Sequence, residues 1–249
     1  MKELNKLYCD TSRVSVREIS SSVAKEIIVK KHYTHAWTAC RYSLGIFYKT
    51  DEVNALGDNE KLIGCLVYGF PVGARAANSV SDAITKDNIL ELTRLFVFDG
   101  YGSNIESWFV GQTFNWLREN APHIKALVSY SDPKVGHLGT VYQATNWIYQ
   151  GNKIRPNDSW SFKWSEIDEW HHSRTSYVKY GTNDPKIIQT MVTSPFWIKK
   201  EPRKHRYVYV LVNGKERKQL LKNLKYPSLP YPKANEEFIE EIHKLEPIN

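Results

Sequence analysis

Cysteine is scarce in this sequence of 249 residues. It occurs only at Cys9, Cys40 and Cys65, without a CxxC pair and without the spacing of a metal finger. These positions argue against a disulfide framework and against a zinc module. Isolated thiols fit a protein that works in a reducing cytoplasm.

Long apolar runs are also absent. No stretch approaches the roughly 20 apolar residues that cross a bilayer, and the charged, polar start lacks a signal-peptide core. We therefore expect a cytoplasmic location and no membrane partner. The sequence also contains no internal repeat and no low-complexity stretch.

Basic and aromatic residues, in contrast, are plentiful. Lys and Arg number 34 against 27 Asp and Glu, and the net charge of +7 attracts polyanions through counterion release. Aromatic residues make up 13% of the chain, enough to leave rings for stacking partners once a core is built. Nucleic acid is the favoured partner, and a mildly basic soluble enzyme is the alternative.

The apolar pattern predicts a mixed order of strands and helices. Runs of β-branched and aromatic residues between turn residues indicate strands, and apolar residues at helical spacing indicate helices. The expected strands are 14–18, 40–49, 61–72, 89–99, 124–131 and a short one at Trp147, and the expected helices are 20–31, 104–123 and a short one carrying Tyr142. The strands 40–49 and 61–72 look like a hairpin, and 89–99 is expected in the middle of a sheet.

This order predicts an α/β protein with one main domain. We place a catalytic core at 1–152 and a Trp-, Lys- and Pro-rich basic extension at 153–249, packed on the core. The last segment of the extension is expected to form a partly docked helix.

Polar side chains gather where the strand 124–131 ends. Asp132-Pro133 breaks the chain there, because proline lacks a backbone donor and restricts the residue before it. Ser131 and Asp132 stand at the carboxyl end of a buried strand, where ligands of open α/β sheets bind. With His137 and Tyr142, they provide an acid, a hydroxyl, an imidazole and a phenol, which are the kinds of groups that can hold an amine nucleophile and move protons. In the alternative, Asp132 only caps the following turn.

Two further groups are candidate functional residues. Glu91 and Arg94 precede a loop that leads into a helix at Asn104, and unpaired amides at a helix start bind anions. An ordinary capped turn is the alternative. His32 and Tyr33 stand at a helix end with His35, where a histidine acts as a base or metal ligand. A packing or solvent-facing histidine is the alternative there.

Basic residues alternate with aromatic ones in the extension. Such a mixture suits phosphate contacts combined with base stacking, and a solvated strand edge is the competing interpretation. The candidate DNA-binding residues are Lys199, Lys200, Arg203, Lys204, His205 and Arg206, beside Trp197, Tyr207 and Tyr209.

Several motifs together resemble a known family. ILELTRLFVFD, the capped helix, LVSYSD and VYQATNWIYQG resemble the GNAT acyltransferase fold, which has a central mixed, mostly antiparallel sheet flanked by helices. Tyr142 takes the position of that fold's usual general acid. More narrowly, KKHYTHAW, CRYSLGIFY, VYGFPVG, SYSDPKVGHLGTVYQ and KHRYVYVL, in collinear order, resemble the Mom family of phage DNA-modification proteins.

The resemblance implies a function and a site. It implies that the exocyclic amine of adenine in double-stranded DNA becomes an acetamido (carbamoylmethyl) group, which protects phage DNA from restriction in the host cytoplasm. By the same resemblance His32, Tyr33 and Asp132 converge, and Ser107 faces the donor with Arg94 and Asn104. Members have been suggested to hold iron, and ligands of the His32 and Asp132 type are compatible with a non-haem metal.

One motif departs from the GNAT pattern. The Gln/Arg-x-x-Gly-x-Gly/Ala loop that binds the coenzyme A pyrophosphate is replaced by 99–104, DGYGSN. The activated two-carbon donor is therefore either acetyl-coenzyme A or a glycyl-tRNA-like molecule, and the second would add tRNA as a partner. The competing functions are an N-acetyltransferase for a small-molecule or protein amine and a non-catalytic DNA-binding protein.

Overall fold

The computed structural model describes residues 8–53, 57, 59–72, 76–153, 159–234 and 237–248. Its contacts divide the chain into two compact units. Unit 1 comprises Met1–Ser131, Gly139–Gly151 and Arg206–Tyr231, and unit 2 comprises Asp132–Leu138, Asn152–His205 and Pro232–Asn249. The domain boundary at 152 stays a prediction, and by contacts unit 1 also includes the segment from Arg206 to Tyr231.

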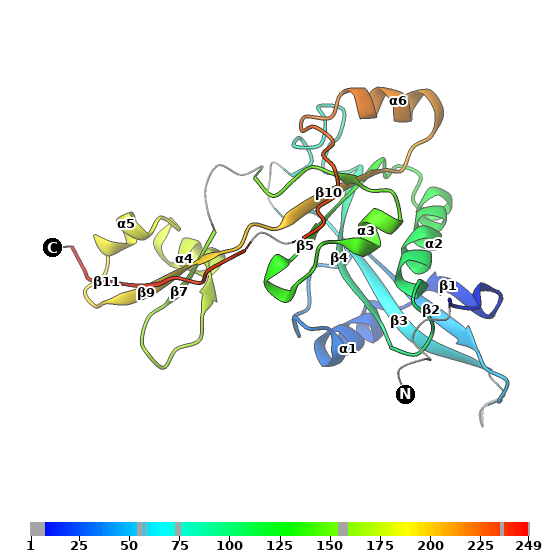
Figure 1. Ribbon diagram of the computed structural model, residues 1–249, viewed down its shortest axis with the longest axis horizontal. Helices are drawn as coiled ribbons and strands as arrows, with labels where there is room; N and C mark the ends of the chain where they lie inside the picture. Colours follow the sequence, from blue (N-terminus) through cyan, green and yellow to red (C-terminus); the bar gives the residue numbers. More distant parts are fainter. Residues whose placement is uncertain are drawn as a thin grey trace. The chain divides into compact units, whose positions relative to one another are not determined.

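A seven-stranded sheet with the order β1-β2-β3-β4-β5-β10-β6 forms the centre of unit 1 (Figure 1). Neighbours from β1 to β4 are antiparallel, β4 and β5 are parallel, and β10 and β6 are antiparallel. The mixed, mostly antiparallel sheet of the sequence prediction is therefore confirmed. The strands are β1 Val14–Glu18, β2 Tyr42–Lys49, β3 Glu60–Gly69, β4 Ile89–Val97, β5 Ala126–Ser131, β6 Ile148–Tyr149 and β10 His205–Val210.

Helices cover both faces of this sheet. Helix α2 (Ile105–Asn120) packs Phe109 and Leu117 onto the face formed by Leu66 and Tyr68 of β3. Helix α1 (Ser21–Lys31) packs on the opposite face, formed by the alternate residues Cys65 and Val67. The remaining helices of unit 1 are the short α3 (Thr140–Ala144) and α6 (Gly214–Lys222), with a 3-10 turn at Thr11–Arg13.

The start of α1 follows the sequence prediction. The hydroxyl of Ser20 accepts a hydrogen bond from the Val23 amide at 3.4 Å, which satisfies one of the unpaired donors of the first turn. The helix ends at Lys31, and His32 is its C-cap. The chain therefore delivers His32 and Tyr33 to the end of α1, as the sequence predicted.

Unit 2 has a smaller sheet with the order β11-β9-β7-β8. Its elements are β7 Ser159–Lys163, β8 His171–His172, α4 Ser173–Tyr180, α5 Pro185–Gln189, β9 Phe196–Glu201 and β11 Ile242–Leu245, with a 3-10 turn at Pro133–Val135. Phe162, Ile188, Phe196 and Ile198 form its core. None of the described helices in either unit is long and apolar enough to cross a bilayer.

The predicted C-terminal helix is wrong. Residues 242–245 form the strand β11, which pairs antiparallel with β9. The apolar side chains that suggested a helix face solvent, because Phe238, Ile239 and Ile242 are 40%, 73% and 55% exposed. Without a surface to bury an apolar stripe, a short helix has little stability, and pairing with β9 satisfies the backbone instead.

Candidate functional site

The two parallel strands of unit 1 part at a defined point. Strands β4 and β5 pair only from Ile89 opposite Ala126 to Glu91 opposite Val128, although β4 continues to Val97 and β5 to Ser131. At the same level the register between β3 and β4 shifts, and a bulge bends β4. The side chains beyond Glu91 therefore border a place where the sheet opens.

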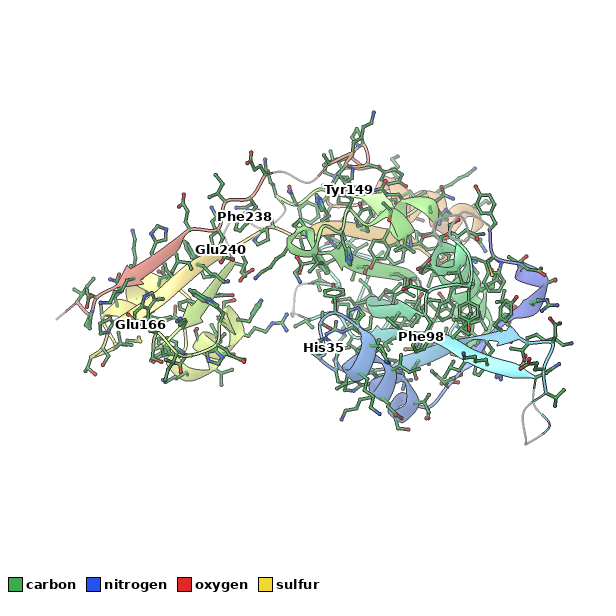
Figure 2. All side chains as sticks on the ribbon, turned by 60° about the horizontal axis from the view of Figure 1, so that its bottom comes forward. His35, Phe98, Tyr149, Glu166, Phe238 and Glu240 are labelled. Atoms are coloured by element: carbon green, nitrogen blue, oxygen red, sulfur yellow. The ribbon has the colours of Figure 1, made fainter. Side chains whose placement is uncertain are left out.

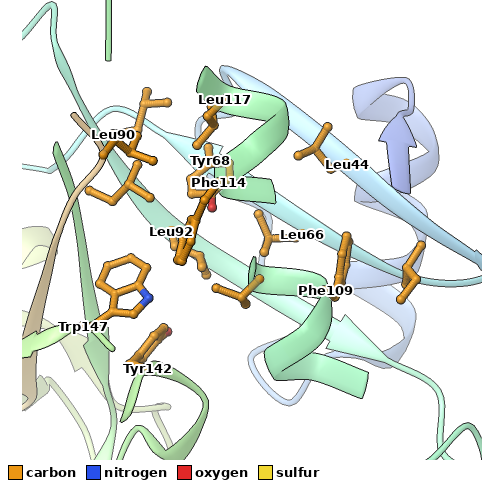
Figure 3. Close-up of a cluster of buried hydrophobic side chains, with 14 of the residues drawn as sticks. Leu44, Leu66, Tyr68, Leu90, Leu92, Phe109, Phe114, Leu117, Tyr142 and Trp147 are labelled. Atoms are coloured by element: carbon orange, nitrogen blue, oxygen red, sulfur yellow. The ribbon is translucent and has the colours of Figure 1, made fainter. Parts of the chain in front are cut away.

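Tyr142 from α3 reaches this opening. The Ser129 hydroxyl has one proton and lies 2.8 Å from the Leu92 carbonyl oxygen, which can only accept. The Tyr142 hydroxyl, 2.7 Å from the same Ser129 oxygen, is therefore the donor in that second contact. Figure 3 shows Tyr142 beside Trp147, at a ring distance of 5.1 Å. Burial raises the pKa of Tyr142 to about 12, so the phenol is neutral and keeps its proton.

Tyr33, Glu91 and Arg94 lie within electrostatic reach of this phenol or of one another. After burial, the hydrogen bond with Ser129 acts to lower the pKa of Tyr142, and the nearby Tyr33 and Glu91 side chains act to raise it. Burial also lowers the pKa of the Arg94 guanidinium, while Tyr33 and Glu91 act in the opposite direction. Arg94 donates from Nε to the Ala36 carbonyl at 3.0 Å. Of the predicted site residues in unit 1, Tyr33 thus lies within electrostatic reach of both Arg94 and Tyr142.

His32 adjoins this group. Its ring contacts that of Tyr33 with the centroids 4.3 Å apart and the planes tilted by 30°, and only 7% of the residue is exposed. The Thr34 amide donates to Nδ1 at 3.2 Å, so Nδ1 acts as an acceptor. Tyr33 itself is 47% exposed, which leaves part of its ring open to solvent. His32 and Tyr33 therefore form a buried imidazole under an accessible phenol.

A metal does not fit the described residues. Among them, no three His, Cys, Asp or Glu side chains are placed to hold one ion. Of the two predicted ligands, His32 has its Nδ1 engaged by Thr34, and Asp132 has its two carboxylate oxygens engaged by the Lys134 amide and by Lys204. The described side chains thus supply no ligand set for iron.

Asp132 caps the turn that follows it. One carboxylate oxygen accepts from the Lys134 amide at 3.0 Å, and the other lies 2.9 Å from the Lys204 ammonium group. The alternative interpretation, that Asp132 caps the following turn, is therefore correct for one of its two carboxylate oxygens. Its convergence with His32 and Tyr33 stays a prediction.

The neighbouring Ser131 has a different environment. Its hydroxyl is buried and forms no hydrogen bond with any described residue. Alternation along β5 places Ser131 on the same face as Ser129, which bonds to Tyr142. A buried hydroxyl without a partner is costly unless a ligand or water satisfies it, so this position suits a polar group of a substrate.

The loop 99–104 is already occupied by another part of unit 1. The Cys9 amide donates to Oδ1 of Asn104 at 2.8 Å, and a Cβ on Gly102 would overlap the Cys9 backbone. Ser107 donates to the Asn104 carbonyl at 3.0 Å. No Lys or Arg occurs between Arg94 and Arg118, while Glu106 adds a negative charge at the start of α2. These features do not fit a coenzyme A pyrophosphate at this loop.

Comparison with known proteins gives a clear family. A profile described as the Mom protein family matches residues 13–233. The chain belongs to this family. It is 26% identical over 226 residues to a protein of Escherichia phage Mu named methylcarbamoylase mom, and the alignment covers 90% of this chain and 85% of that protein.

Two solved structures that are similar to this Mom family member are N-acetyltransferases. One, from Staphylococcus aureus, has a TM-score of 0.40 and 12% identity, with 80% of this chain and 99% of that chain covered. A spermidine N-acetyltransferase from Vibrio cholerae has a TM-score of 0.42 and 6% identity, with 81% and 95% covered.

The predicted DNA-binding residues of this Mom protein differ in exposure. Lys199, His205 and Arg206 are buried, at 6%, 3% and 2% exposed. Arg206 donates to the Ser79 hydroxyl at 2.9 Å, and Lys199 lies 3.0 Å from Glu240, which Figure 2 labels. Buried and paired cations do not present their charge to a phosphate. Lys200, Arg203 and Lys204 are the more accessible members of the set.

Sequence reasoning omitted two residues of the gathered group. Ser129 is not among the candidate residues of the sequence analysis, and Glu91 appears there only as a neighbour of Arg94 at the predicted anion-binding loop, without a catalytic role. The available signal was the alternation of β5, because the face that carries Ser131 also carries Ser129. For Glu91 the signal was its position in a strand that is otherwise rich in buried apolar residues.

Because the phenol of Tyr142 is buried, we expect the folded protein to lose stability at alkaline pH. The pKa of Tyr142 is raised to about 12 by burial, above its unfolded value of about 10. Its stabilising effect is therefore complete below about pH 10 and is lost as the pH rises through about 12, by about 1–3 kcal/mol. Thermal unfolding between pH 9 and 12 measures it. Tyr142→Phe should flatten this decline, whereas Tyr177→Phe, at a residue 59% exposed, should leave it unchanged.

Proposed function

We propose that this protein modifies adenine in double-stranded DNA, replacing one hydrogen of the exocyclic amine with a carbamoylmethyl group. Membership of the Mom family supports this function, as does similarity to a protein named a methylcarbamoylase. The net charge of +7 favours a polyanionic substrate. The modified base would protect phage DNA from restriction, and the protein would be phage-encoded and work in the host cytoplasm.

The gathering of Tyr33, Arg94 and Tyr142 where β4 and β5 part is the observation that carries this proposal. A transferase needs a proton donor for its leaving group, and a neutral phenol with a pKa of about 12 retains its proton at pH 7. Arg94, within electrostatic reach of Tyr33 and Glu91, supplies positive charge for the negative charge that develops on the donor. The Ser131 hydroxyl, buried at the end of β5, is available to a polar substrate group.

The adenine must leave the duplex to reach such a site, because its amine is engaged in base pairing. We assign His32 and Asp132 to orient the amine and accept its proton, and Tyr33 to line the entrance with its accessible ring. As the carbon–nitrogen bond forms, the bond to the donor's leaving group breaks. Tyr142 protonates that group. An adenine amine is weakly basic, so positioning and electrostatics contribute most of the activation.

The donor is an activated two-carbon group. The covered loop 99–104 and its lack of basic residues argue against coenzyme A bound in the usual place. A glycyl-tRNA-like donor fits this loop better, since its phosphates can bind elsewhere and its glycyl unit contains the atoms C2H3NO that the product gains. Its ester activates the carbonyl carbon, so the donor's amino nitrogen must form the amide at that carbon and release the tRNA hydroxyl, while its bond to the methylene carbon breaks as the adenine nitrogen bonds there. On this account tRNA is a second nucleic-acid partner.

Mass spectrometry of nucleosides tests the proposal directly. Plasmid DNA from bacteria that express the protein should yield deoxyadenosine with an added C2H3NO, and isotopic label fed as glycine should enter the adduct. Asp132→Asn keeps an oxygen for the turn cap but removes the carboxylate, and this variant should yield no adduct. Unmodified nucleosides from soluble, folded wild-type protein would refute the proposal. Acetylation of a small-molecule or protein amine instead would identify an ordinary N-acetyltransferase.

A further inference from the structure

The basic excess of the chain is concentrated in unit 1. Over the residues of each unit, unit 1 has 21 Lys and Arg against 15 Asp and Glu, a net charge of +6, whereas unit 2 has 13 against 12. The segment Gly214–Lys225 alone contributes five basic residues and one acidic residue. The charge that favours nucleic acid therefore belongs mostly to the unit that holds Tyr33, Arg94 and Tyr142, and it peaks at α6.

The lysines of α6 share one side of the helix. Lys215, Lys218 and Lys222 are spaced by three and four residues, so they follow one another along a single stripe. All three are exposed, and none forms an ion pair with a described residue. Like charges at this spacing destabilise a helix. Stability does not explain the stripe, whereas an anionic partner does.

The opposite side of α6 is anchored to unit 1. Leu220 is 4% exposed and belongs to the same buried cluster as Val208 and Val210 of β10. Arg217 donates to the Val210 carbonyl and lies 5.6 Å from the centre of the Tyr209 ring. The Lys225 amide, just beyond the helix, donates to the Val80 carbonyl at 3.0 Å. Helix α6, which Figure 1 labels, is thus held in a fixed position on unit 1 together with its lysines.

We propose that the stripe Lys215, Lys218 and Lys222 on α6 binds the phosphate backbone of the DNA substrate. Between Lys215 and Lys222 the helix rises about 10 Å, which equals about three steps of 3.4 Å between phosphates along one DNA strand. A lysine stem brings one mobile point charge to each phosphate without reading the base. The inference rests on the proposed function for its choice of DNA as the partner.

The basic run of unit 2 is a weaker candidate for this contact. Carboxylates neutralise several of its lysines: Lys199 pairs with Glu240 at 3.0 Å, and Lys204 pairs with Asp132 at 2.9 Å. A phosphate would have to displace these carboxylates, whereas at α6 the lysines have no described carboxylate partner. The net charge of unit 2 is also close to zero.

Binding of a short DNA duplex over a range of salt concentrations tests the stripe. The triple variant Lys215→Gln, Lys218→Gln, Lys222→Gln removes three charges while retaining side chains that are compatible with a helix. At about 0.1 M salt its affinity should fall at least about tenfold, and the slope of log affinity against log salt should decrease by about 2 to 3. Circular dichroism checks that the variant is folded.

A matched variant separates the stripe from net charge. Lys25→Gln, Lys49→Gln, Lys61→Gln removes the same charge at exposed positions elsewhere in unit 1, and its slope should change by less than about 1. Equal effects of the two triple variants, or wild-type DNA binding by the α6 variant, would overturn the proposal. Loss of tRNA binding with unchanged DNA binding would overturn it too.

The DNA-binding result for α6 can be interpreted separately from the measurement of modified nucleosides. If the wild-type protein yields no modified adenine yet binds DNA through α6, the proposed function fails and the surface stands. If modified adenine is made and the α6 variant binds DNA normally, the surface fails and the proposed function stands.

Discussion

Tyr142→Phe should reduce the yield of modified adenine by at least about a hundredfold, the scale on which a general acid contributes. Only one oxygen is lost, and the ring remains packed against Trp147 and Tyr207. Ser129 still donates to the Leu92 carbonyl at 2.8 Å, so no buried donor is left unsatisfied. The loss of one neutral hydrogen bond costs about 1 kcal/mol, and the protein should stay folded while the chemistry stops.

Ser129→Ala is the matched control for this variant. It removes the acceptor of the Tyr142 proton but leaves the phenol in place, so activity should stay within a few-fold of wild type. Stability should fall by about 1–3 kcal/mol, because a buried hydroxyl loses its partner. The yield of modified nucleoside measures the activity of both variants, and denaturant titration measures their free energy of unfolding. If Ser129→Ala abolishes the product as fully as Tyr142→Phe, Tyr142 is a positioning residue rather than a proton donor.

The secondary structure of unit 1 could be predicted because its signals are local. The predicted strand at 14–18 coincides with β1, and Ser20 caps α1 as its residue type and position indicated. Leu90 and Leu92 lie in the core, and β4 takes a central place in the sheet. Period and capping are properties of neighbouring residues, so one sequence is sufficient to see them.

The contacts of the candidate site could not be predicted in the same way. The bond between Tyr142 and Ser129 depends on where α3 turns back across β5, and the group of Tyr33 and Arg94 depends on two segments far apart in the sequence. A count of basic residues also gives every Lys and Arg the same weight, whether its side chain is buried or exposed. It does not reveal that Arg206 is buried against Ser79 while Lys215 is exposed on α6.

The C-terminal segment was mispredicted for a related reason. Its apolar spacing fits a helix, but a pattern indicates only which side chains would share a face. It does not show whether a surface exists to bury that face. The open edge of β9 offered backbone partners, and Ile242–Leu245 pairs there.

Gly69→Ala should damage both stability and activity. Gly69 ends β3, and a Cβ at this position would overlap the carbonyl oxygen of Ala39. The obstacle is backbone, so the segment after α1 must move. That segment carries His32 and Tyr33, and its Ala36 carbonyl accepts from Arg94 at 3.0 Å. Overpacking of this kind costs about 1–3 kcal/mol, and displacement of site residues by about 1 Å should reduce product about a hundredfold.

Gly111→Ala provides the control for the same chemical change. Gly111 lies inside α2, and a Cβ there meets no described atom within 4 Å. Alanine has a higher helix propensity than glycine, so the free energy of unfolding should rise by up to about 1 kcal/mol. Activity should be unchanged. Denaturant titration and nucleoside analysis of the two variants give the comparison. Wild-type activity in a folded Gly69→Ala protein would show that the segment after α1 can shift without disturbing the reaction, and would remove His32 and Tyr33 from the proposed chemistry.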